Sequence, residues 1–569
     1  MMELNSENVT KLLYPSAAFQ SSTSSSIDAS DQAESAQLKP HSWTTSTLNP
    51  KNRVDSLTEP LNAMWRVDGS AGMGTQFYTV PIFLGRPVPM RIDTFIPERK
   101  DIPADLQEIL DIGPAFYTRD NRVARLGIAR YIVRVLDRWS RQVPDFEALY
   151  NSLPFGSRIV LQNVEREIRS VKVQILQTHF LERQLLSIES LQAMWNIPSD
   201  SWPEATDISN IALVEQLHDS VSLVKYAGQT RIMKSLTSSP KYLYHELKVL
   251  LTMSPHRCII SRPSHLIVKR CNFGSKLAVV GFILDYYSGG ALRDALSWRR
   301  THRCLQLQDQ VEWSIQLTEA LIHIRDNGIM YCDLRLDNIV LNGNDDGIVM
   351  IDFEARGVGT FLSAPEVTYL EYINFLANEP NDYMAQSERD HFKRLHEIVT
   401  SGRSLSQSGE TYRNPRHGYC HSWLCIGEDE REAAQVCMLG KVIWGIFEGV
   451  GSPEKGLLVE HLREDVLEYP EWRSTPLAIR DLINACCTSW RPYKKFPLAK
   501  TGQLVRLRNS DGAETREQVR DAAGRWWKTE LQNAEKFIAQ RAGAASTLIS
   551  TRPKLEEVLL FLKSFEKAL

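Results

Sequence analysis

The chain has 569 residues, 43% of them hydrophobic, which is enough apolar material for the cores of roughly two to four domains. Its 66 basic and 69 acidic residues leave a net charge of only −3, so the overall charge does not favour nucleic acid or an anionic membrane as a partner. No apolar run is as long as a membrane span, and the first residues lack the pattern of a signal peptide. We therefore expect an intracellular protein of the cytoplasm or nucleus.

All nine cysteines lie from Cys258 onward at irregular spacings, and none belongs to a Cys-x-x-Cys pair. An odd number of cysteines without such pairs fits neither a disulfide framework nor a zinc site. We expect reduced thiols.

Residues 1–60 are rich in Ser, Thr, Asn and Gln and contain few aliphatic clusters. A segment of this composition cannot bury enough apolar surface to offset its chain entropy, which predicts a disordered tail. Its serines could be phosphorylation targets, although a plain tail explains the composition without that role.

Residues 61–205 are predicted to form a helical module that follows an irregular, proline-punctuated lead-in. Helical patterns cover about 120–141 and about 157–196. In the second, apolar residues recur in alternating steps of three and four, which predicts one helix face made of Leu161, Val164, Ile168, Val171 and Ile175. We expect this stripe to pack inside the chain, because a coiled-coil dimer needs more heptads than the segment contains. Arginines along the first helix could contact phosphates, but a solvated helix face is the simpler interpretation.

The next part of the chain reads as a sheet with one helix. Residues 208–226 alternate loosely between apolar and polar, and 231–236 continue the pattern, which predicts three strands. Ser239-Pro240 offers an N-cap and a first-turn proline for a helix. Glu246 lies beside the apolar face of that helix, where an unpaired carboxylate would be costly. Residues 277–284 form a further apolar strand.

Polar residues then gather around a predicted hairpin. A helix over 308–327 leads into residues 330–354, where two short apolar runs flank a polar turn. Asp333 and Asn338 stand at the entrance of this hairpin and Asp352 at its exit. A carboxylate, an amide and a second carboxylate held on a rigid hairpin suit a site that positions a hydroxyl and divalent metal ions against a phosphate chain.

These residues carry a resemblance to a known family. Asp333-Leu-Arg-Leu-Asp-Asn338 resembles the catalytic loop of protein kinases, Asp352-Phe-Glu resembles their metal-binding Asp-Phe-Gly, and Ser363-Ala-Pro-Glu366 matches the Ala-Pro-Glu that closes their activation segment. Because the three motifs follow in the family's order, the chain is identified as a member of the protein kinase superfamily. The second and third motifs most resemble a divergent group of kinase-like proteins of filamentous fungi. The resemblance implies an α+β fold over residues 206–569, with a small β-rich lobe and a large helical lobe.

The resemblance also implies how the chain would bind ATP. Lys234 is the counterpart of the strand lysine that contacts the α and β phosphates, and an ion pair with Glu246 would remove the cost of burying that carboxylate. Asp285, Tyr286 and Tyr287 correspond to the hinge between the lobes, whose backbone hydrogen-bonds the adenine.

By the same resemblance, four residues would carry out the transfer. Asp333 is the base that would orient the substrate hydroxyl, and Arg335 would bring positive charge to the migrating phosphoryl group. Asn338 and Asp352 are the expected ligands of two Mg²⁺ ions.

The large lobe is expected to carry a central helix over about 433–447. It also contains two predicted insertions, at about 376–428 and about 491–548. Arg552 resembles the arginine that pairs with the Glu of Ala-Pro-Glu, which is Glu366 here, and Arg491 is a rival for that role.

Four departures from the family pattern bear on activity. The glycine-rich loop that covers the phosphates is absent, since residues 215–221 contain no glycine. Tyr331-Cys332 replaces His-Arg before the catalytic Asp, which removes the cation that would read a phosphorylated activation loop, so we expect no such switch. Glu354 replaces the glycine after Asp-Phe. Gln435 stands where the central helix usually offers an Asp that braces the catalytic loop.

Three functions remain open on this basis. The first is a protein kinase that transfers the γ-phosphate of ATP to Ser or Thr hydroxyls of an unidentified protein substrate. The second is a pseudokinase that serves as a docking scaffold, which the missing glycines favour. The third is a kinase of small molecules, against which the Ala-Pro-Glu motif and the long large lobe argue.

Overall fold

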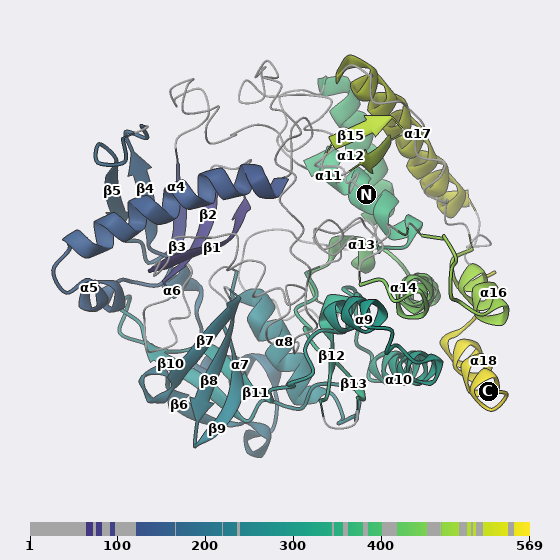
Figure 1. Cartoon of the computed structure of the whole chain (residues 1–569), viewed down its shortest axis with the longest axis horizontal. Coiled ribbons are helices and arrows are strands. Elements are labelled where there is room, and N and C mark those ends of the chain that lie inside the picture. The colour runs from purple at the N-terminus through teal and green to yellow at the C-terminus, as the bar shows by residue number, and fades with distance from the viewer. Residues whose placement is uncertain are drawn as a thin grey trace.

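The computed structural model shows two large sheets, two short hairpins and a mainly helical region among the residues it describes (Figure 1). It describes residues 64–71, 76–81, 92–96, 121–165, 167–218, 220–235, 239–343, 346–356, 362–378, 385–400, 418–451, 467, 469–488, 498–501, 504–507, 516–543 and 551–569. The predicted disordered tail, residues 1–60, lies outside this part. Among the helices described, none combines the length and the apolar character that crossing a membrane requires. All nine cysteines are free thiols, as predicted.

The amino-terminal part of the described chain is built on a five-stranded sheet. Its strands follow in the order β1 (Trp65–Ala71), β2 (Gln76–Pro81), β3 (Ile92–Phe95), β4 (Arg158–Gln162) and β5 (Lys172–Leu176), and only β3 and β4 are parallel. The helices of this part are α4 (Asn121–Gln142), α5 (Phe146–Ser152), α6 (Phe180–Gln184) and α7 (Ile188–Trp195). Figure 1 shows α4 lying across β1 to β3.

The prediction of a helical module over 61–205 is therefore wrong in part. The helix over about 120–141 is confirmed by α4, but the segment over about 157–196 forms β4 and β5 before the short helices α6 and α7. The spacing from Leu161 to Ile175 suggested a helix, yet Ile159 and Leu161 are the buried positions of an alternating strand. Asn163, with φ of 53°, lies in the left-handed region that a helix cannot continue through. The parallel pairing of β4 with β3 joins residues far apart in sequence, which local periodicity does not reveal.

This part is fastened to the next sheet by hydrogen bonds. The buried carboxylate of Glu182 accepts from the backbone N–H groups of Phe155 at 3.3 Å and Phe273 at 2.8 Å. The carbonyl of Leu186 accepts from the backbone N–H of Val279 at 2.8 Å, and the N–H of Leu186 donates to the Tyr244 hydroxyl at 2.8 Å. One continuous hydrophobic core therefore runs through both sheets.

The second sheet has six strands in the order β6-β10-β11-β9-β8-β7. These are β6 (Glu204–Asp207), β7 (Ala212–His218), β8 (Val221–Tyr226), β9 (Gln229–Ser235), β10 (His265–Arg270) and β11 (Leu277–Leu284), with α8 (Lys241–Thr252) following β9. The strands predicted over 208–226, 231–236 and 277–284, and the helix after Ser239-Pro240, are all confirmed. The predicted domain boundary at 206 falls within β6, and this division stays a prediction.

The rest of the chain is mainly helical. Its helices are α9 (Leu292–Thr301), α10 (Leu307–Asp326), α11 (Pro365–Asn378), α12 (Gln386–Thr400), α13 (His421–Leu424), α14 (Glu428–Glu448), α16 (Leu477–Cys486), α17 (Arg516–Gly543) and α18 (Leu555–Glu566). The predicted hairpin is present as β12 (Ile339–Leu341) paired with β13 (Ile348–Met350), and β14 (Leu498–Thr501) pairs with β15 (Leu504–Leu507). Short 3-10 turns lie at Ser199–Ser201, Ile208–Asn210 and Leu336–Asn338.

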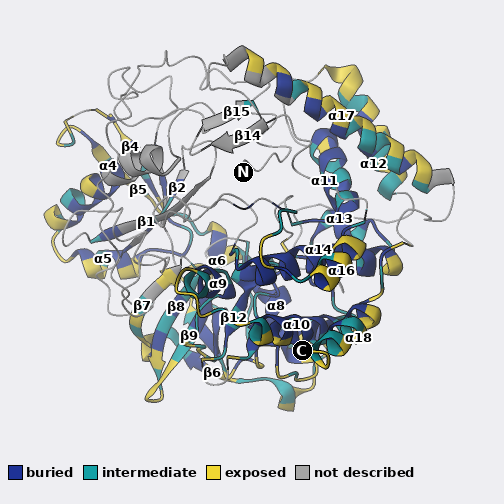
Figure 2. Cartoon of the chain, turned by 45° about the vertical axis from the view of Figure 1, so that its right-hand side comes forward, coloured by how far each residue is buried: buried dark blue, intermediate teal, exposed yellow. Residues whose placement is uncertain are grey.

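The central helix predicted over about 433–447 is confirmed by α14. Every residue from Glu432 to Glu448 is buried, and α14 lies among α10, α13 and α16 (Figure 2). The helix ends at Gly449, whose φ of 63° is the left-handed conformation that glycine adopts without strain. A helix surrounded on all sides explains why its apolar residues do not form a single stripe.

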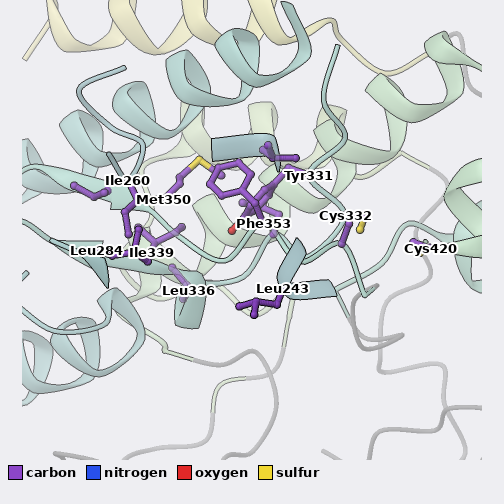
Figure 3. Packing of buried hydrophobic residues seen from close by; sticks show 14 of the residues in the cluster. Leu243, Ile260, Leu284, Tyr331, Cys332, Leu336, Ile339, Met350, Phe353 and Cys420 are labelled. Carbon is purple, nitrogen blue, oxygen red and sulfur yellow. The ribbon is translucent and has the colours of Figure 1, made fainter. Parts of the chain in front are cut away.

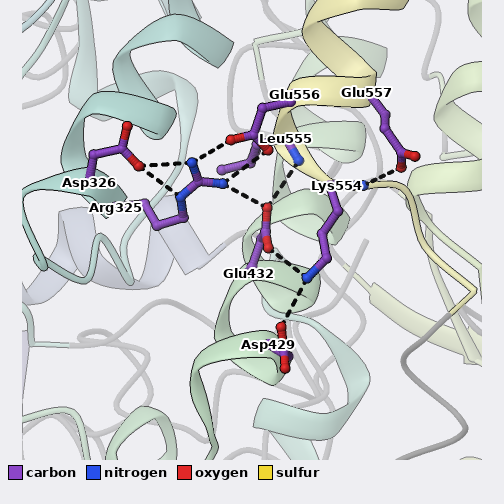
Figure 4. Close-up of polar contacts among 8 residues, drawn as sticks. All are labelled: Arg325, Asp326, Asp429, Glu432, Lys554, Leu555, Glu556 and Glu557. Atoms are coloured by element: carbon purple, nitrogen blue, oxygen red, sulfur yellow. Dashed lines mark hydrogen bonds and ion pairs between the residues drawn. The ribbon is translucent and has the colours of Figure 1, made fainter.

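Charged side chains fasten α18 to α10 and α14 (Figure 4). Arg325 at the end of α10 contacts both Glu432 of α14, at 2.9 Å, and Glu556 of α18, at 2.5 Å. Lys554 donates to Glu432 at 2.9 Å and to Asp429 at 3.0 Å. Most of these groups are partly exposed, so they fix orientation more than they add stability.

A second charged contact is buried. Arg552 forms a two-pronged ion pair with Glu366, at 2.6 and 3.2 Å, and donates to the carbonyl of Ala433 at 2.9 Å. Lys441 of α14 donates to the carbonyl of Ser363 at 2.6 Å. The predicted pair of Arg552 with Glu366 is confirmed, and the Ser-Ala-Pro-Glu segment is held from both α14 and the start of α18.

We expect Arg552→Ala to lower the free energy of unfolding by about 3–5 kcal/mol, because the buried Glu366 carboxylate loses its cation. Urea unfolding measures this change. Lys554→Ala is the matched control, since its side chain is half exposed and its ion pairs are worth about 1 kcal/mol or less. Equal losses in the two variants would contradict a special role for the buried pair.

Candidate active site

The site is organised around Lys234, which the sheet holds in a fixed place. Lys234 lies near the end of β9, opposite Phe282 of the neighbouring β11. Gly281 allows this close pairing, because a Cβ atom there would come within 2.4 Å of the Lys234 carbonyl oxygen. The lysine side chain is buried and points toward α8 and the segment after β13, as its contacts show.

Three carboxylates surround the Lys234 ammonium. Its Nζ atom lies 2.5 Å from Glu246 of α8, 2.8 Å from Asp352 and 3.0 Å from Glu354. The predicted ion pair of Lys234 with Glu246 is therefore present. Oxygens of the three acids lie within 4.8 Å of one another, a spacing that could hold a metal ion, but the ammonium already supplies the cation among them.

The electrostatics of this cluster follow from burial and from its excess of negative charge. Burial alone would lower the pKa of Lys234, but the surrounding carboxylates hold that pKa well above its ordinary value. Burial, helped by the two other acids, raises the pKa of Glu246 against the opposing effect of Lys234. Burial would also raise the pKa of Asp352, yet the nearby ammonium keeps it below the ordinary value. The cluster is thus a charged, largely dry group that is sensitive to any further charge.

Glu354 belongs to this cluster, which sequence reasoning did not foresee. The residue was noted only as a replacement for glycine, whereas its buried carboxylate contacts both Lys234 and Arg356. The signal that could have revealed it is the acid itself, because a glutamate two residues after Asp352 on a buried segment needs a cation.

The predicted catalytic loop lies beside the cluster. Asn338 Nδ2 donates to the carbonyl of Asp333 at 2.9 Å and to its carboxylate at 3.0 Å, so the amide fixes the acid's orientation. Tyr331 OH donates to the carbonyl of Ile351 at 2.5 Å, which ties the loop to the strand before Asp352. Burial raises the pKa of Asp333 to about 6, although Arg335 works in the opposite direction.

Asp352 adopts a strained backbone conformation. Its φ is 66°, a region that residues with a side chain rarely occupy, and such strain is often kept where function requires it. The carboxylate of Asp352 and the amide of Asn338 are oxygen donors of the kind that Mg²⁺ prefers, so the residues fit the predicted metal. Mg²⁺ binding itself stays a prediction.

The remaining predicted residues lie on the catalytic loop, for Arg335, and directly after β11, for Asp285, Tyr286 and Tyr287. Arg335 Nε is 3.6 Å from the Asp333 carboxylate, and its side chain is 42% exposed, so it can reach a ligand from the open side. Asp285 follows β11 and pairs with Arg231 across from it, Tyr286 is exposed and Tyr287 is partly buried. Their adenine-binding role stays a prediction.

Two departures from the family pattern have structural counterparts. The strands β7 and β8 pair as far as His218 and Val221, which leaves two residues between them. Gln435 of α14 donates to the carbonyl of Tyr331 at 3.5 Å, so a neutral amide reaches the catalytic loop from the central helix. This contact is at the outer limit of hydrogen bonding and is weaker than one from a carboxylate.

A β-sheet that carries a Lys–Glu pair, joined to a helical region through a hairpin with Asp333, Asn338 and Asp352, has the organisation of a protein kinase fold. The hairpin holds the acids next to the lysine, as a site for phosphate and metal requires.

Comparisons with known proteins agree with this architecture. Residues 211–380 match the family described as protein kinase domain, so this part of the chain is a protein kinase domain, and it covers less than a third of the whole. A stretch of 159 residues is 25% identical to the probable serine/threonine-protein kinase WNK9 of Oryza sativa subsp. japonica. The stretch is 27% of this chain and 35% of the rice protein, so the similarity spans about a third of that relative.

We expect Lys234→Met to destabilise the protein without any ligand by about 3–5 kcal/mol, because three acids lose their shared cation. The loss should shrink as the pH falls from 8 to 5, since the carboxylates of the variant then take up protons and need no cation. Thermal unfolding across this pH range measures both effects.

Lys225→Met is the control, because Lys225 is exposed on β8 of the same sheet. If both variants lost the same amount of stability, and that loss did not depend on pH, the Lys234 ammonium would not hold the three carboxylates together.

Proposed function

We propose that the chain is an ATP-dependent protein kinase that transfers the γ-phosphate to Ser or Thr hydroxyls of protein substrates. The observation that carries this proposal is the buried Lys234 ammonium, which links β9 with α8 and with Asp352 beside the Asp333–Asn338 loop. Such a cation, held by acids from two elements, suits the phosphates of a nucleotide. The name of the rice relative supports a Ser/Thr hydroxyl as acceptor.

The residues of the loop would perform the transfer in the following way. Asp333, mostly ionised at pH 7, accepts the proton of the substrate hydroxyl, and Asn338 keeps the carboxylate in place at 3.0 Å. Lys234 exchanges a carboxylate contact for the phosphates of the nucleotide, while Arg335 adds positive charge at the exposed edge. Mg²⁺, bound through Asn338 and Asp352, would supply the charge that neutralises the phosphate oxygens.

One observation favours the second candidate, a pseudokinase scaffold. Glu354 adds a third carboxylate beside Lys234, and this negative charge opposes the approach of a polyanionic nucleotide.

The sequence details around Asp352-Phe-Glu and Ser363-Ala-Pro-Glu support a place in the divergent fungal group of kinase-like proteins.

The kinase proposal is tested with labelled ATP, Mg²⁺ and a generic protein substrate. We expect Asp333→Asn to lower kcat by about 10²–10⁴-fold, because the hydroxyl proton loses its acceptor. Below about pH 6 the wild-type kcat/KM should fall about tenfold per pH unit, since Asp333 is then protonated.

Asp337→Asn is the matched control, because Asp337 lies in the same loop and its carboxylate pairs with Arg293 at 2.6 Å. Equal label incorporation in wild type and Asp333→Asn would overturn the proposal. So would absent incorporation in both, together with no effect of Mg·ATP on the melting temperature.

Glu354→Gln tests the electrostatic opposition directly. We expect this variant to bind Mg·ATP about tenfold more tightly. The amide keeps the size of the side chain but removes the negative charge of Glu354 that lies beside Lys234. Isothermal titration calorimetry measures the affinity, and Glu397→Gln on the exposed face of α12 serves as control. Unchanged or weaker binding would mean that Glu354 does not restrain the lysine.

A further inference from the structure

Three residues that precede α13 lie among the elements of the site. Gly418, Tyr419 and Cys420, called the clamp segment below, belong to the predicted insertion over about 376–428. Gly418 and Cys420 are buried, and Tyr419 is partly buried. Residues of an insertion are expected on the surface, so their burial against α8 and the catalytic loop requires an explanation.

Tyr419 packs on α8, the helix that carries Glu246. Its ring meets Tyr242 edge to face, with centroids 5.6 Å apart, and lies 5.9 Å from the ring of His245. The Lys241 ammonium is 5.0 Å from the Tyr419 ring, close enough for a cation–π contact. An edge-to-face aromatic pair contributes about 0.5–1.5 kcal/mol beyond the free energy of burying its surface area. The Tyr419 ring therefore stabilises the position of α8.

The contact extends from Tyr242 to the charged cluster. The guanidinium of Arg356 lies over the Tyr242 ring at 4.9 Å and pairs with Glu354, which contacts Lys234. Tyr242 therefore stands between Tyr419 and the arginine that holds Glu354.

Gly418 fits between α8 and the segment that follows Asp352. A Cβ atom at this position would come within 2.7 Å of Ala355 Cβ and 3.0 Å of His245 Nε2. Its φ of 80° also favours glycine. The backbone of the clamp segment thus fills the space between these two elements, and neither can move toward the other.

Cys420 reaches the catalytic loop. The neighbouring thiol of Cys332, together with burial, raises the pKa of Cys420 well above its ordinary value. Both cysteines belong to the buried cluster around Phe353 and Tyr331 (Figure 3). Cys332 directly precedes Asp333 and stands where the family usually has an arginine.

We propose that Gly418–Cys420 is a built-in clamp that positions Glu246, Glu354 and Asp333 for nucleotide binding and transfer, without a phosphorylated residue. A phosphorylated loop would need a cation at position 332, and this position is instead a cysteine in the same buried cluster as Cys420. The role in nucleotide binding rests on the proposed kinase function. The positioning of α8 does not, because the contacts exist in the protein without ligand.

The test compares Tyr419→Ala with Tyr419→Phe. Hydrogen exchange without nucleotide should be about tenfold faster for the α8 amides in Tyr419→Ala and unchanged in Tyr419→Phe, since phenylalanine keeps the ring that touches Tyr242 and His245. The dissociation constant for Mg·ATP should rise about tenfold in Tyr419→Ala only, and KM for ATP should rise more than kcat falls. If Tyr419→Ala does not fold, Tyr419→Leu, which keeps bulk but not the aromatic contacts, is measured in its place.

Tyr372→Ala is the matched control, because Tyr372 is a buried tyrosine of α11 that packs edge to face on Trp527, in a separate hydrophobic cluster. It should lower the melting temperature without changing exchange in α8. The clamp proposal is overturned if the α8 amides of Tyr419→Ala exchange at the wild-type rate. It is also overturned if their exchange rises as much in Tyr372→Ala as in Tyr419→Ala. If wild type does not bind Mg·ATP, the kinase proposal fails, whereas the exchange data still decide the clamp.

Discussion

The burial of one ammonium group among three carboxylates is the interaction on which the described kinase region depends. Lys234 can stay charged inside the protein only because acids from α8 and from the segment after β13 reach it. Those acids need the lysine equally, so the sheet, the helix and the hairpin must pack together for any of the charges to be tolerated. The architecture of the region and the chemistry of its site therefore have the same physical cause.

The rest of the structure keeps these charges in place. The helical region is fixed by the buried helix α14, by the Arg552–Glu366 pair beneath the Ser-Ala-Pro-Glu segment, and by the exposed charges around Arg325. The sheet side is fixed by the amino-terminal part through Glu182 and Leu186. Of these contacts, the one from Leu186 reaches Val279 on β11, the strand that pairs with β9 at Lys234.

The site departs from its family at positions that share one consequence. Glu354 in place of glycine adds negative charge beside Lys234, and Cys332 stands directly before Asp333 where the family usually has an arginine. Both changes make the electrostatic free energy of binding a polyanion such as ATP less favourable. In the proposed clamp, the packing of the Tyr419 ring on Tyr242 keeps α8 and its Glu246 in position without an added charge.

The sequence alone determined the strands β7, β8, β9 and β11, the helices α8, α10 and α14 and the hairpin of β12 with β13, because their periodicity and turn residues are local signals. It determined the acids of the hairpin through their motif. The resemblance to protein kinases also placed the pairs of Lys234 with Glu246 and of Arg552 with Glu366, and for Glu246 the cost of an unpaired buried carboxylate pointed to a cation as well. Only the tertiary structure decided that residues 158–162 and 172–176 form strands, that Glu354 joins the cluster, and that Gly418–Cys420 reaches α8. These three features depend on contacts between segments far apart in the chain, and neither spacing nor composition records such contacts.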